Sequence, residues 1–282
     1  MVGRRSRAAQ RGFVVEQVHR GEGISETVHG TPRQLLAGRV RGYRGYRPER
    51  GGSARLRLVP STQVNLDISI GALPRLNGST AVPAGAVYGM RTGPAGLARF
   101  DGQGILVGLS PHGAYTLLGV PLSEVADTVF DLVDVLGRPA AQIVDRLAET
   151  SEWQARLALL DDVLAVRAAN GPQPAPQVVW AWQRLCRSNG RVSIARLAAE
   201  VGWTRRHLLT RFREQIGLTP KTAARVLRFQ QALQLLHQPG DRPPPARVAQ
   251  MTGYSDQAHL IREFRALAGT TPVELTVDWP HR

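Results

Sequence analysis

The chain has 282 residues, of which 43% are hydrophobic and 21% are charged, so it can form a folded core and wholesale disorder is excluded. Its 36 Lys and Arg against 22 Asp and Glu give a net charge of +14, which favours a polyanionic partner such as nucleic acid. The single cysteine, Cys186, excludes an internal disulfide, a multi-thiolate zinc site and an iron–sulfur cluster.

The length predicts about two domains. No apolar run is long enough for a transmembrane helix or a secretory signal, so we expect a cytoplasmic protein with no membrane partner. Residues 1–57 and 171–282 each carry +9, whereas residues 58–170 carry −4. We expect residues 1–12 to form a flexible basic tail and residues 13–169 to form a β-rich effector or dimerisation domain that ends in helices.

The stretch from Arg41 to Arg47 repeats arginine, glycine and tyrosine. Such a sequence can contact nucleic acid through arginine charge and tyrosine stacking. The alternative is a basic loop that precedes the first strands. We favour the loop, because one pair of such triplets is not an array.

Residues 55–110 have the pattern of β-structure. In the segment 64–70, apolar residues alternate with Asn65, Asp67 and Ser69, which is typical of a half-buried strand. A second apolar run, 105–109, is closed by Ser110 and a proline. Frequent glycine and proline residues between short strands favour a sandwich or a barrel.

Residues 122–169 change to a helical period. Trp153, Leu157, Leu160 and Leu164 lie on one face of a predicted helix. Their spacing is compatible with the seam of a homodimer. The alternative is that this face packs against the β-rich region, and two heptads are too few to decide between the two.

Residues 170–176 contain three prolines and a glycine, which cannot continue a helix and therefore predict an interdomain linker. The remaining residues, 177–282, are predicted to be helical apart from a proline-rich stretch at 239–245. The predicted fold class is thus α+β, with a β-rich N-terminal domain and an all-α C-terminal domain.

The strongest signal in the sequence is an internal repeat between residues 197–220 and 248–272. Both copies contain Gly followed by Trp or Tyr, and then the pattern His-Leu-x-x-x-Phe-Arg-x-x-x-Gly-x-Thr-Pro. The offset is 51 residues at Ala198 and Ala249 but 52 at His207 and His259, so the turn of the second copy contains one extra residue.

Each copy predicts a helix, a turn and a second helix. Gly202 and Gly253 supply the positive φ that the turn requires, and we expect Thr204 and Ser255 to cap the helix that follows. That helix buries a Leu and a Phe four residues apart and carries arginine on its other faces. This is the helix-turn-helix arrangement of DNA-binding proteins. The alternative is a pair of α-hairpins from a helical repeat array, which the arginine enrichment disfavours.

Between the two copies, residues 220–237 predict one long helix that begins at a proline. A rigid helix of this length spans about 25 Å. It could present the two recognition helices to successive major-groove segments, which lie about 34 Å apart.

Residues 177–278 resemble the DNA-binding domain of AraC/XylS-type transcription regulators. The matching motifs include Gly202-Trp203-Thr204, Gly217-Leu218-Thr219-Pro220 and the specific run from Gly253 to Arg265, followed by Gly269-Thr270-Thr271-Pro272. The resemblance implies that this region binds double-stranded promoter DNA through two helix-turn-helix subdomains, with RNA polymerase as a further partner. It implies contacts to DNA from Arg205, Arg206, Leu209, Thr210, Gln257, Ala258, His259 and Arg262.

Thr210 and His259 differ from the other positions in this set. The family often has arginine at the position of Thr210, and in this chain Arg211 lies one step further round the helix. His259 is expected near the DNA backbone rather than at the bases.

The N-terminal part more weakly resembles β-rich sensor domains attached to regulators of this type. The match covers residues 111–121 and a following helix, 122–136. It implies a domain that binds a small-molecule effector or forms a homodimer, and it identifies no ligand.

Two other hypotheses for residues 1–170 stay open: an enzyme or dedicated small-molecule binder for which DNA binding is secondary, and a domain that only dimerises. The sequence shows no catalytic constellation, no cofactor motif and no metal-ligand spacing. His112 is more typical of a loop than of a ligand site, and Cys186 is expected to be a buried structural thiol.

Overall fold

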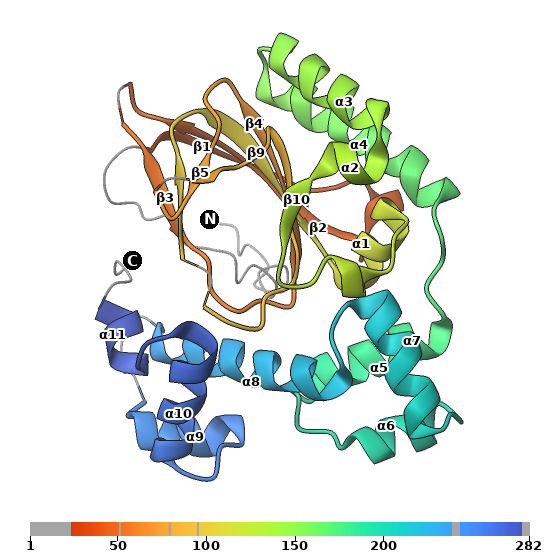
Figure 1. Cartoon of the computed structure of the whole chain (residues 1–282), viewed down its shortest axis with the longest axis vertical. Coiled ribbons are helices and arrows are strands. Elements are labelled where there is room, and N and C mark those ends of the chain that lie inside the picture. The colour runs from red at the N-terminus through yellow and green to blue at the C-terminus, as the bar shows by residue number, and fades with distance from the viewer. Residues whose placement is uncertain (1–23, 51, 79, 95, 239–242, 278–282) are drawn as a thin grey trace, which may run out of the picture.

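The computed structural model describes residues 24–50, 52–78, 80–94, 96–238 and 243–277. The expected tail, part of the proline-rich stretch near residue 240 and the last five residues therefore lie outside the described residues. Within them, a β-rich N-terminal part precedes a helical C-terminal part, which confirms the predicted fold class (Figure 1).

Two antiparallel sheets form the N-terminal part. The larger has the strand order β1-β2-β9-β4-β7-β10, and the smaller has the order β3-β8-β5-β6. The strands of the larger sheet are β1 (Ile24–Gly30), β2 (Val40–Pro48), β9 (Gln103–Leu109), β4 (Val64–Ile70), β7 (Gly85–Tyr88) and β10 (Val129–Asp131). Those of the smaller sheet are β3 (Ala54–Arg57), β8 (Leu97–Phe100), β5 (Arg75–Leu76) and β6 (Thr80–Ala81).

Helices cover one face of the larger sheet, and the smaller sheet lies on its other side (Figure 1). The covering elements are α1 (Pro111–Leu118), α2 (Leu132–Leu136), α3 (Arg138–Glu149) and α4 (Trp153–Asn170), with two short 3-10 helices, η1 (Gln34–Leu36) and η2 (Leu122–Glu124). The expected helix over residues 122–136 is wrong, because η2 and strand β10 interrupt that range and only its last five residues form the helix α2.

The helical face proposed as a dimer seam is instead an internal contact. Trp153, Leu160 and Leu164 are buried, and they belong to the same core cluster as the β4 side chains Leu66 and Ile68. The packing alternative is therefore correct. The sheet offers this helix an apolar face within the same chain, so these residues are not free to meet a second copy.

The Arg41–Arg47 stretch is not a loop, because it forms the centre of strand β2, and its tyrosines do not face solvent. Tyr43 and Tyr46 are 2% exposed. Their hydroxyl groups donate to Asp161 at 2.6 Å and to Asp67 at 3.0 Å. Rings buried in this way cannot stack on bases.

The expectation of a half-buried strand at 64–70 is also wrong, because both faces of β4 are buried. The apolar set packs on the helices, whereas Asn65, Asp67 and Ser69 lie between the two sheets. A pattern of alternation predicts two distinct faces, but it does not predict that a second sheet covers the polar one.

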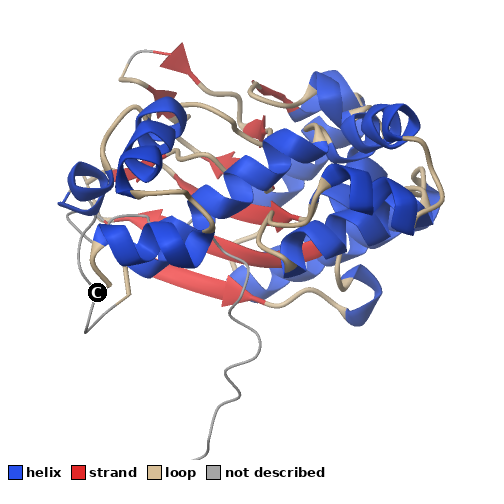
Figure 2. Ribbon diagram, turned by 90° about the horizontal axis from the view of Figure 1, so that it is seen from below, coloured by secondary structure: helices blue, strands red, loops and turns tan. Residues whose placement is uncertain are grey.

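The C-terminal helices are α5 (Pro176–Arg187), α6 (Ile194–Glu200), α7 (Arg205–Ile216), α8 (Pro220–Leu236), α9 (Pro245–Thr252), α10 (Gln257–Ala268) and α11 (Pro272–Val277). Seen from below, they lie in front of the strands (Figure 2). Residues 171–175 separate α4 from α5, as the prolines predict. None of the described helices combines the length and apolar character needed to cross a bilayer.

The core does not stop at this break. One cluster of buried side chains runs from the larger sheet through α4 into α5, α6 and α7. A second cluster joins α8, α9 and α10, and it includes Val59, which lies just before β4. The two parts of the chain are therefore packed together, mainly where α1 and η2 meet α7, with a smaller contact from Val59 to the helices around α8.

His112 and Cys186, which the sequence did not favour as site residues, are both partly buried in helices. His112 lies at the start of α1 with Nε2 3.2 Å from Ser110 Oγ, and burial lowers its pKa to about 4. Cys186 is partly buried in α5, where burial raises the pKa of its thiol to about 12, so it is protonated at neutral pH.

Candidate nucleic-acid interface

The first helix-turn-helix copy consists of α6, a glycine turn and α7. Gly202 has φ +69°, as the turn requires. Ser193 Oγ accepts from the backbone N–H of Arg196 at 3.2 Å, and Thr204 Oγ1 accepts from that of His207 at 3.2 Å. The cap expected at Thr204 is thus confirmed, and both helices of the copy begin at a side-chain cap.

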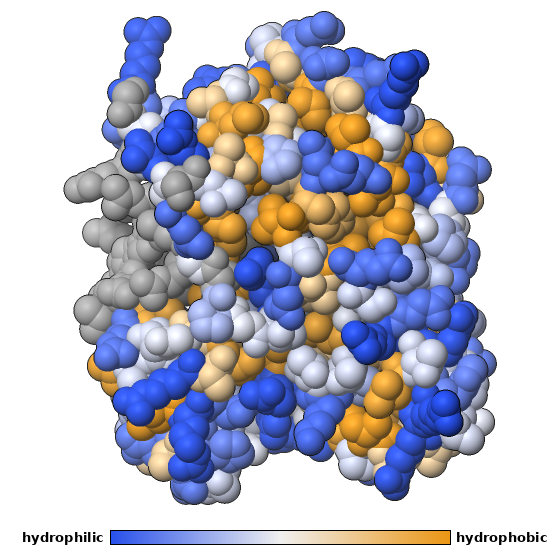
Figure 3. Space-filling view, in the orientation of Figure 1, coloured by the Kyte–Doolittle hydropathy of each residue, from blue (hydrophilic) through white to orange (hydrophobic). Residues whose placement is uncertain are grey.

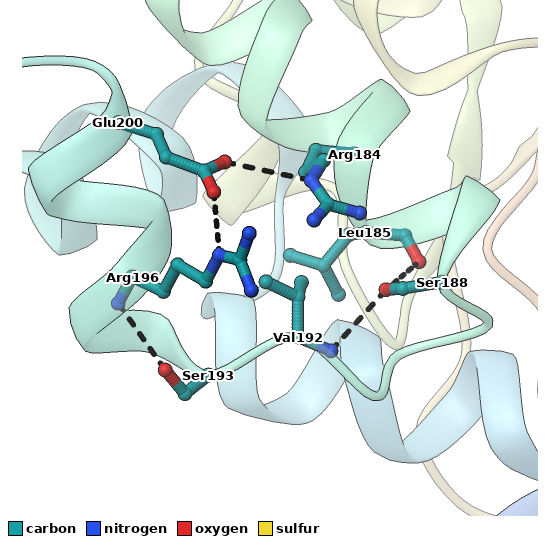
Figure 4. A network of polar contacts seen from close by, with 7 residues as sticks. All are labelled: Arg184, Leu185, Ser188, Val192, Ser193, Arg196 and Glu200. Carbon is teal, nitrogen blue, oxygen red and sulfur yellow. Dashed lines mark hydrogen bonds and ion pairs between the residues drawn. The ribbon is translucent and has the colours of Figure 1, made fainter.

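Polar contacts hold α6 against α5 (Figure 4). Glu200 accepts from Arg196 at 2.6 Å and lies 3.4 Å from Arg184 of α5. The hydrogen bond from Arg196 lowers the pKa of Glu200 below its ordinary value. Ser188 Oγ donates to the Leu185 carbonyl and accepts from the N–H of Val192, which shapes the chain between the two helices. These polar contacts fix the position of α6, the first helix of the copy, on α5.

Helix α7 divides into a buried and an exposed side. Leu208 and Phe212 are fully buried, and the Phe212 ring lies 6.3 Å from that of Trp182 in α5. The residues expected to contact DNA are all exposed: Arg205, Arg206, Leu209 and Thr210. Leu209, at 44% exposure, is unusual as a large apolar side chain in this position.

Thr210 occupies the position at which the family often has arginine. The Thr210 hydroxyl donates to the backbone carbonyl of Arg206 at 3.1 Å, which leaves its methyl group outward. Arg211, one step further round the helix, pairs with Glu214 at 2.7 Å. Arg213 is exposed one turn beyond Leu209 and was missed in the sequence, although its spacing of seven from Arg206 is the signal for a shared face.

The second copy consists of α9, the turn at Gly253 and α10, with φ +82° at the glycine. The cap expected at Ser255 is wrong. Asp256 Oδ1 accepts from the N–H of His259 at 2.6 Å, and this bond lowers the pKa of the Asp256 carboxyl. The extra residue of the second turn explains the shift, because it makes Asp256 the counterpart of Thr204.

Helix α10 repeats the division seen in α7. Leu260 and Phe264 are fully buried, whereas Gln257, Ala258 and Arg262 are exposed. Arg265, which the sequence reasoning did not include, is exposed three residues after Arg262. The lower part of the molecule, where these helices lie, shows many strongly hydrophilic side chains (Figure 3).

His259 stands apart from the other site residues because it is half-buried. Its ring lies edge-on to Tyr254 at 5.2 Å, and its Nδ1 is 3.1 Å from Ser255 Oγ. The imidazole is therefore turned back toward the start of α10. This position agrees with a role near the DNA backbone better than with contact to base edges.

Helix α8, which runs over 17 residues as expected, carries the second copy rigidly. The Phe229 ring of α8 lies 4.6 Å from Phe264 of α10. Beside it, Arg225 donates two hydrogen bonds to Glu263, at 3.0 and 3.1 Å, and these raise the pKa of the guanidinium. A bidentate pair fixes orientation as well as distance.

The two caps provide a direct test of the correction at α10. Asp256→Ala should lower the free energy of unfolding measurably, because it removes the acceptor of an otherwise unpaired helix N–H. Ser255→Ala should have a smaller effect, and Thr204→Ala serves as the matched variant in the first copy. Urea unfolding of the three variants measures this, and an equal loss for Ser255→Ala and Asp256→Ala would contradict the assignment.

Comparison with known proteins agrees with this geometry. Residues 197–276 match the family model of a helix-turn-helix domain. Over 69 residues, the chain is 42% identical to YbfI of Bacillus subtilis strain 168, an uncharacterized HTH-type transcriptional regulator, and the match covers 24% of each chain. The match thus spans about a quarter of that relative.

Two solved structures are also similar. The C-terminal domain of AraT, a response regulator from Geobacillus stearothermophilus, is 18% identical with a TM-score of 0.35, over 38% of this chain and 88% of that one. ToxT from Vibrio cholerae O395, bound to (E)-4-(8-methylnaphthalen-1-yl)but-3-enoic acid, is 10% identical with a TM-score of 0.45, over 80% of this chain and 94% of that one.

The C-terminal part of the chain is a double helix-turn-helix domain of DNA-binding regulators. The matched residues 197–276 lie inside the region 177–278 whose motifs resemble AraC/XylS-type regulators, so the match agrees with that resemblance.

Proposed function

We propose that the protein is a transcription regulator that binds double-stranded promoter DNA and reads two adjacent major-groove segments, one with α7 and one with α10. The observation that carries the proposal is the pairing of two capped, arginine-bearing recognition helices on the single helix α8. A small-molecule effector held by the β-rich part would control this binding. The protein would act in the cytoplasm, where promoter DNA and RNA polymerase are present.

The exposed side chains divide by the contacts they can make. Arg206 and Arg262 suit guanine, since a guanidinium can donate to O6 and N7 together, and Gln257 suits adenine. Leu209, Ala258 and the Thr210 methyl group suit the thymine methyl. Arg205, Arg213 and Arg265 would neutralise phosphates and set the salt dependence of binding.

The β-rich part packs on the DNA-binding part through α1 and η2, which lie against α7, and through three further contacts. Thr62, just before β4, donates to Gln230 in the middle of α8 at 3.0 Å. Gly217, which ends α7, has no room for a side chain, since a Cβ would lie 2.7 Å from Met90 Cε. At the end of α10, a Cβ on Gly269 would lie 3.3 Å from Pro94. A rearrangement of the β-rich part would therefore reach both recognition helices, which supports control by an effector.

The experiment is selection of random-sequence DNA by the full chain at two salt concentrations, since the shared core argues against cutting the chain at residue 171. The expected result is an enriched site with two short blocks about one helical turn apart. Enrichment of nothing, with binding that collapses as salt rises, would reduce the interface to electrostatic attachment.

Arg262→Ala should weaken binding to the selected site by about 1–3 kcal/mol and relax the preference at one base pair, with a much smaller loss on random DNA. Arg138→Ala, which removes an exposed arginine of α3, is the charge-matched control. Titration of both variants against the two DNAs measures the difference. Equal losses on both DNAs would make Arg262 a phosphate contact.

A homodimer is the remaining proposal for the β-rich part. With the apolar face of α4 buried internally, a dimer would have to use another surface, and sedimentation of the full chain tests it.

A further inference from the structure

The space between the two sheets contains a row of polar side chains from strand β4. Asp67 pairs in register with Leu106 of β9 and Ala86 of β7. Leu106 packs with Phe100 of the smaller sheet, and Ala86 belongs to a cluster that contacts Leu76 there. Since directly opposite residues of an antiparallel pair share a face, Asp67 points toward the smaller sheet.

Asp67 is fully buried, and only one of its oxygens has a partner. Oδ1 accepts from the Tyr46 hydroxyl at 3.0 Å, whereas Oδ2 has no hydrogen-bond partner among the described residues. The hydroxyl groups of Tyr88 and of Ser69, which shares the polar face of β4, are likewise buried without a partner in the described part of the chain. The Ser69 hydroxyl lies near enough to Asp67 to oppose the rise of its pKa. Buried polar atoms are nearly always bonded, so these three unpaired atoms on neighbouring strands require an explanation.

The charged and titratable groups around Asp67 determine whether a cation or an anion could bind beside it. The titratable side chains on this face of the larger sheet are Tyr46 and Arg44 of β2, the exposed His29 of β1, Tyr88 of β7 and Asp131 of β10. Arg91, which follows β7, lies near the Tyr88 hydroxyl and opposes the rise of its pKa. The described inward side chains of the smaller sheet are apolar: Leu76, Ala98 and Phe100. No described cation forms an ion pair with Asp67, and burial raises its pKa to about 7. A cation placed here would therefore gain a charge-assisted bond that the protein itself does not supply.

We propose that Asp67, with the hydroxyl groups of Tyr46 and Tyr88, binds the protonated amino group of a small organic ligand between the two sheets. This inference rests on the proposed effector control and names the effector's chemical class. An ammonium group has three donors for Asp67 Oδ2 and the two phenolic oxygens. The Tyr46 and Phe100 rings, packed edge to face at 5.2 Å, offer π-faces that attract a cation. A carboxylate ligand would meet like charge.

The same two strands lead to the DNA-binding part. The segment before β4 carries Val59 and Thr62, which pack on α8. The segment after β7 carries Met90 and Pro94, which lie against the ends of α7 and α10. A ligand that contacts Asp67 and Tyr88 would therefore act on the two paired strands whose neighbouring segments meet α8 and the ends of α7 and α10.

The test measures thermal unfolding and calorimetric binding of the full chain with four amines: methylamine, benzylamine, 2-phenylethylamine and putrescine. Two controls match 2-phenylethylamine in shape, namely 2-phenylethanol and phenylacetate. We expect at least one amine to stabilise the protein at pH 8 and bind at least tenfold more tightly than either control. Affinity should fall as pH is lowered through about 7, since protonation of Asp67 removes the charge.

Variants locate the binding site. Asp67→Asn should weaken the best amine at least tenfold, Tyr88→Phe should weaken it several-fold with the fold intact, and Asp134→Asn, an exposed carboxylate of α2, should leave it unchanged. The proposal is overturned if none of the four amines binds, if phenylacetate binds as well as the amines, or if Tyr88→Phe and Asp67→Asn both bind like the unaltered chain. DNA selection does not enter these readouts, so a failure here is distinct from a failure of the proposed function.

Discussion

Phe264→Ala should lower the free energy of unfolding by about 3–5 kcal/mol, because it opens a large cavity at the centre of the second helix-turn-helix copy. The ring is fully buried and touches Phe229 of α8, so its loss removes the main apolar contact between the recognition helix and the helix that carries it. Urea unfolding of the full chain measures the change.

The matched variant is Phe212→Ala, which makes the same change in the first copy, where the ring packs near Trp182. Footprinting on the selected DNA should show each variant losing protection of one block while keeping the other. Loss of both blocks in both variants would show that the two copies unfold as one cooperative unit, which would contradict separate reading by α7 and α10.

Asp67→Asn should change how stability depends on pH. Burial raises the pKa of Asp67 to about 7, so the folded state binds its proton more tightly than the unfolded state does. The contribution of Asp67 to the free energy of unfolding is therefore largest below the ordinary carboxyl pKa, and it is lost as pH rises through about 7. A shift of this size corresponds to roughly 4 kcal/mol at most.

The measurement is denaturant unfolding between pH 4 and pH 8. The unaltered chain should lose more stability across this range than Asp67→Asn, which has no carboxyl to ionise, while the exposed Asp134→Asn should follow the unaltered chain. Parallel curves for all three proteins would show that the pKa of Asp67 is not raised in the folded state, which would contradict this prediction.

The sequence by itself determined the DNA-binding part, because the signals there are local. Gly202 and Gly253 sit where a turn needs positive φ, Thr204 sits where a helix needs an acceptor, and the Leu–Phe pairs lie four residues apart on each recognition helix. Each signal acts within a few residues, so its spacing survives in the sequence. The error at Ser255 came from placing the extra turn residue one position too late, and the exposed Arg213 and Arg265 were left out.

Tertiary structure alone decided the β-rich part, because its contacts join residues far apart in the chain. Tyr43 bonds Asp161, and Trp153 packs across Gly45. The spacing of residues along the chain does not show which distant side chain each residue contacts. In the sequence the tyrosines of β2 therefore resembled nucleic-acid contacts, and the apolar face of α4 resembled a dimer seam. The polar face of β4 resembled a solvated one for the same reason. Only the smaller sheet, folded over it, places Asp67 in a buried space where an unpaired carboxylate oxygen can select a ligand.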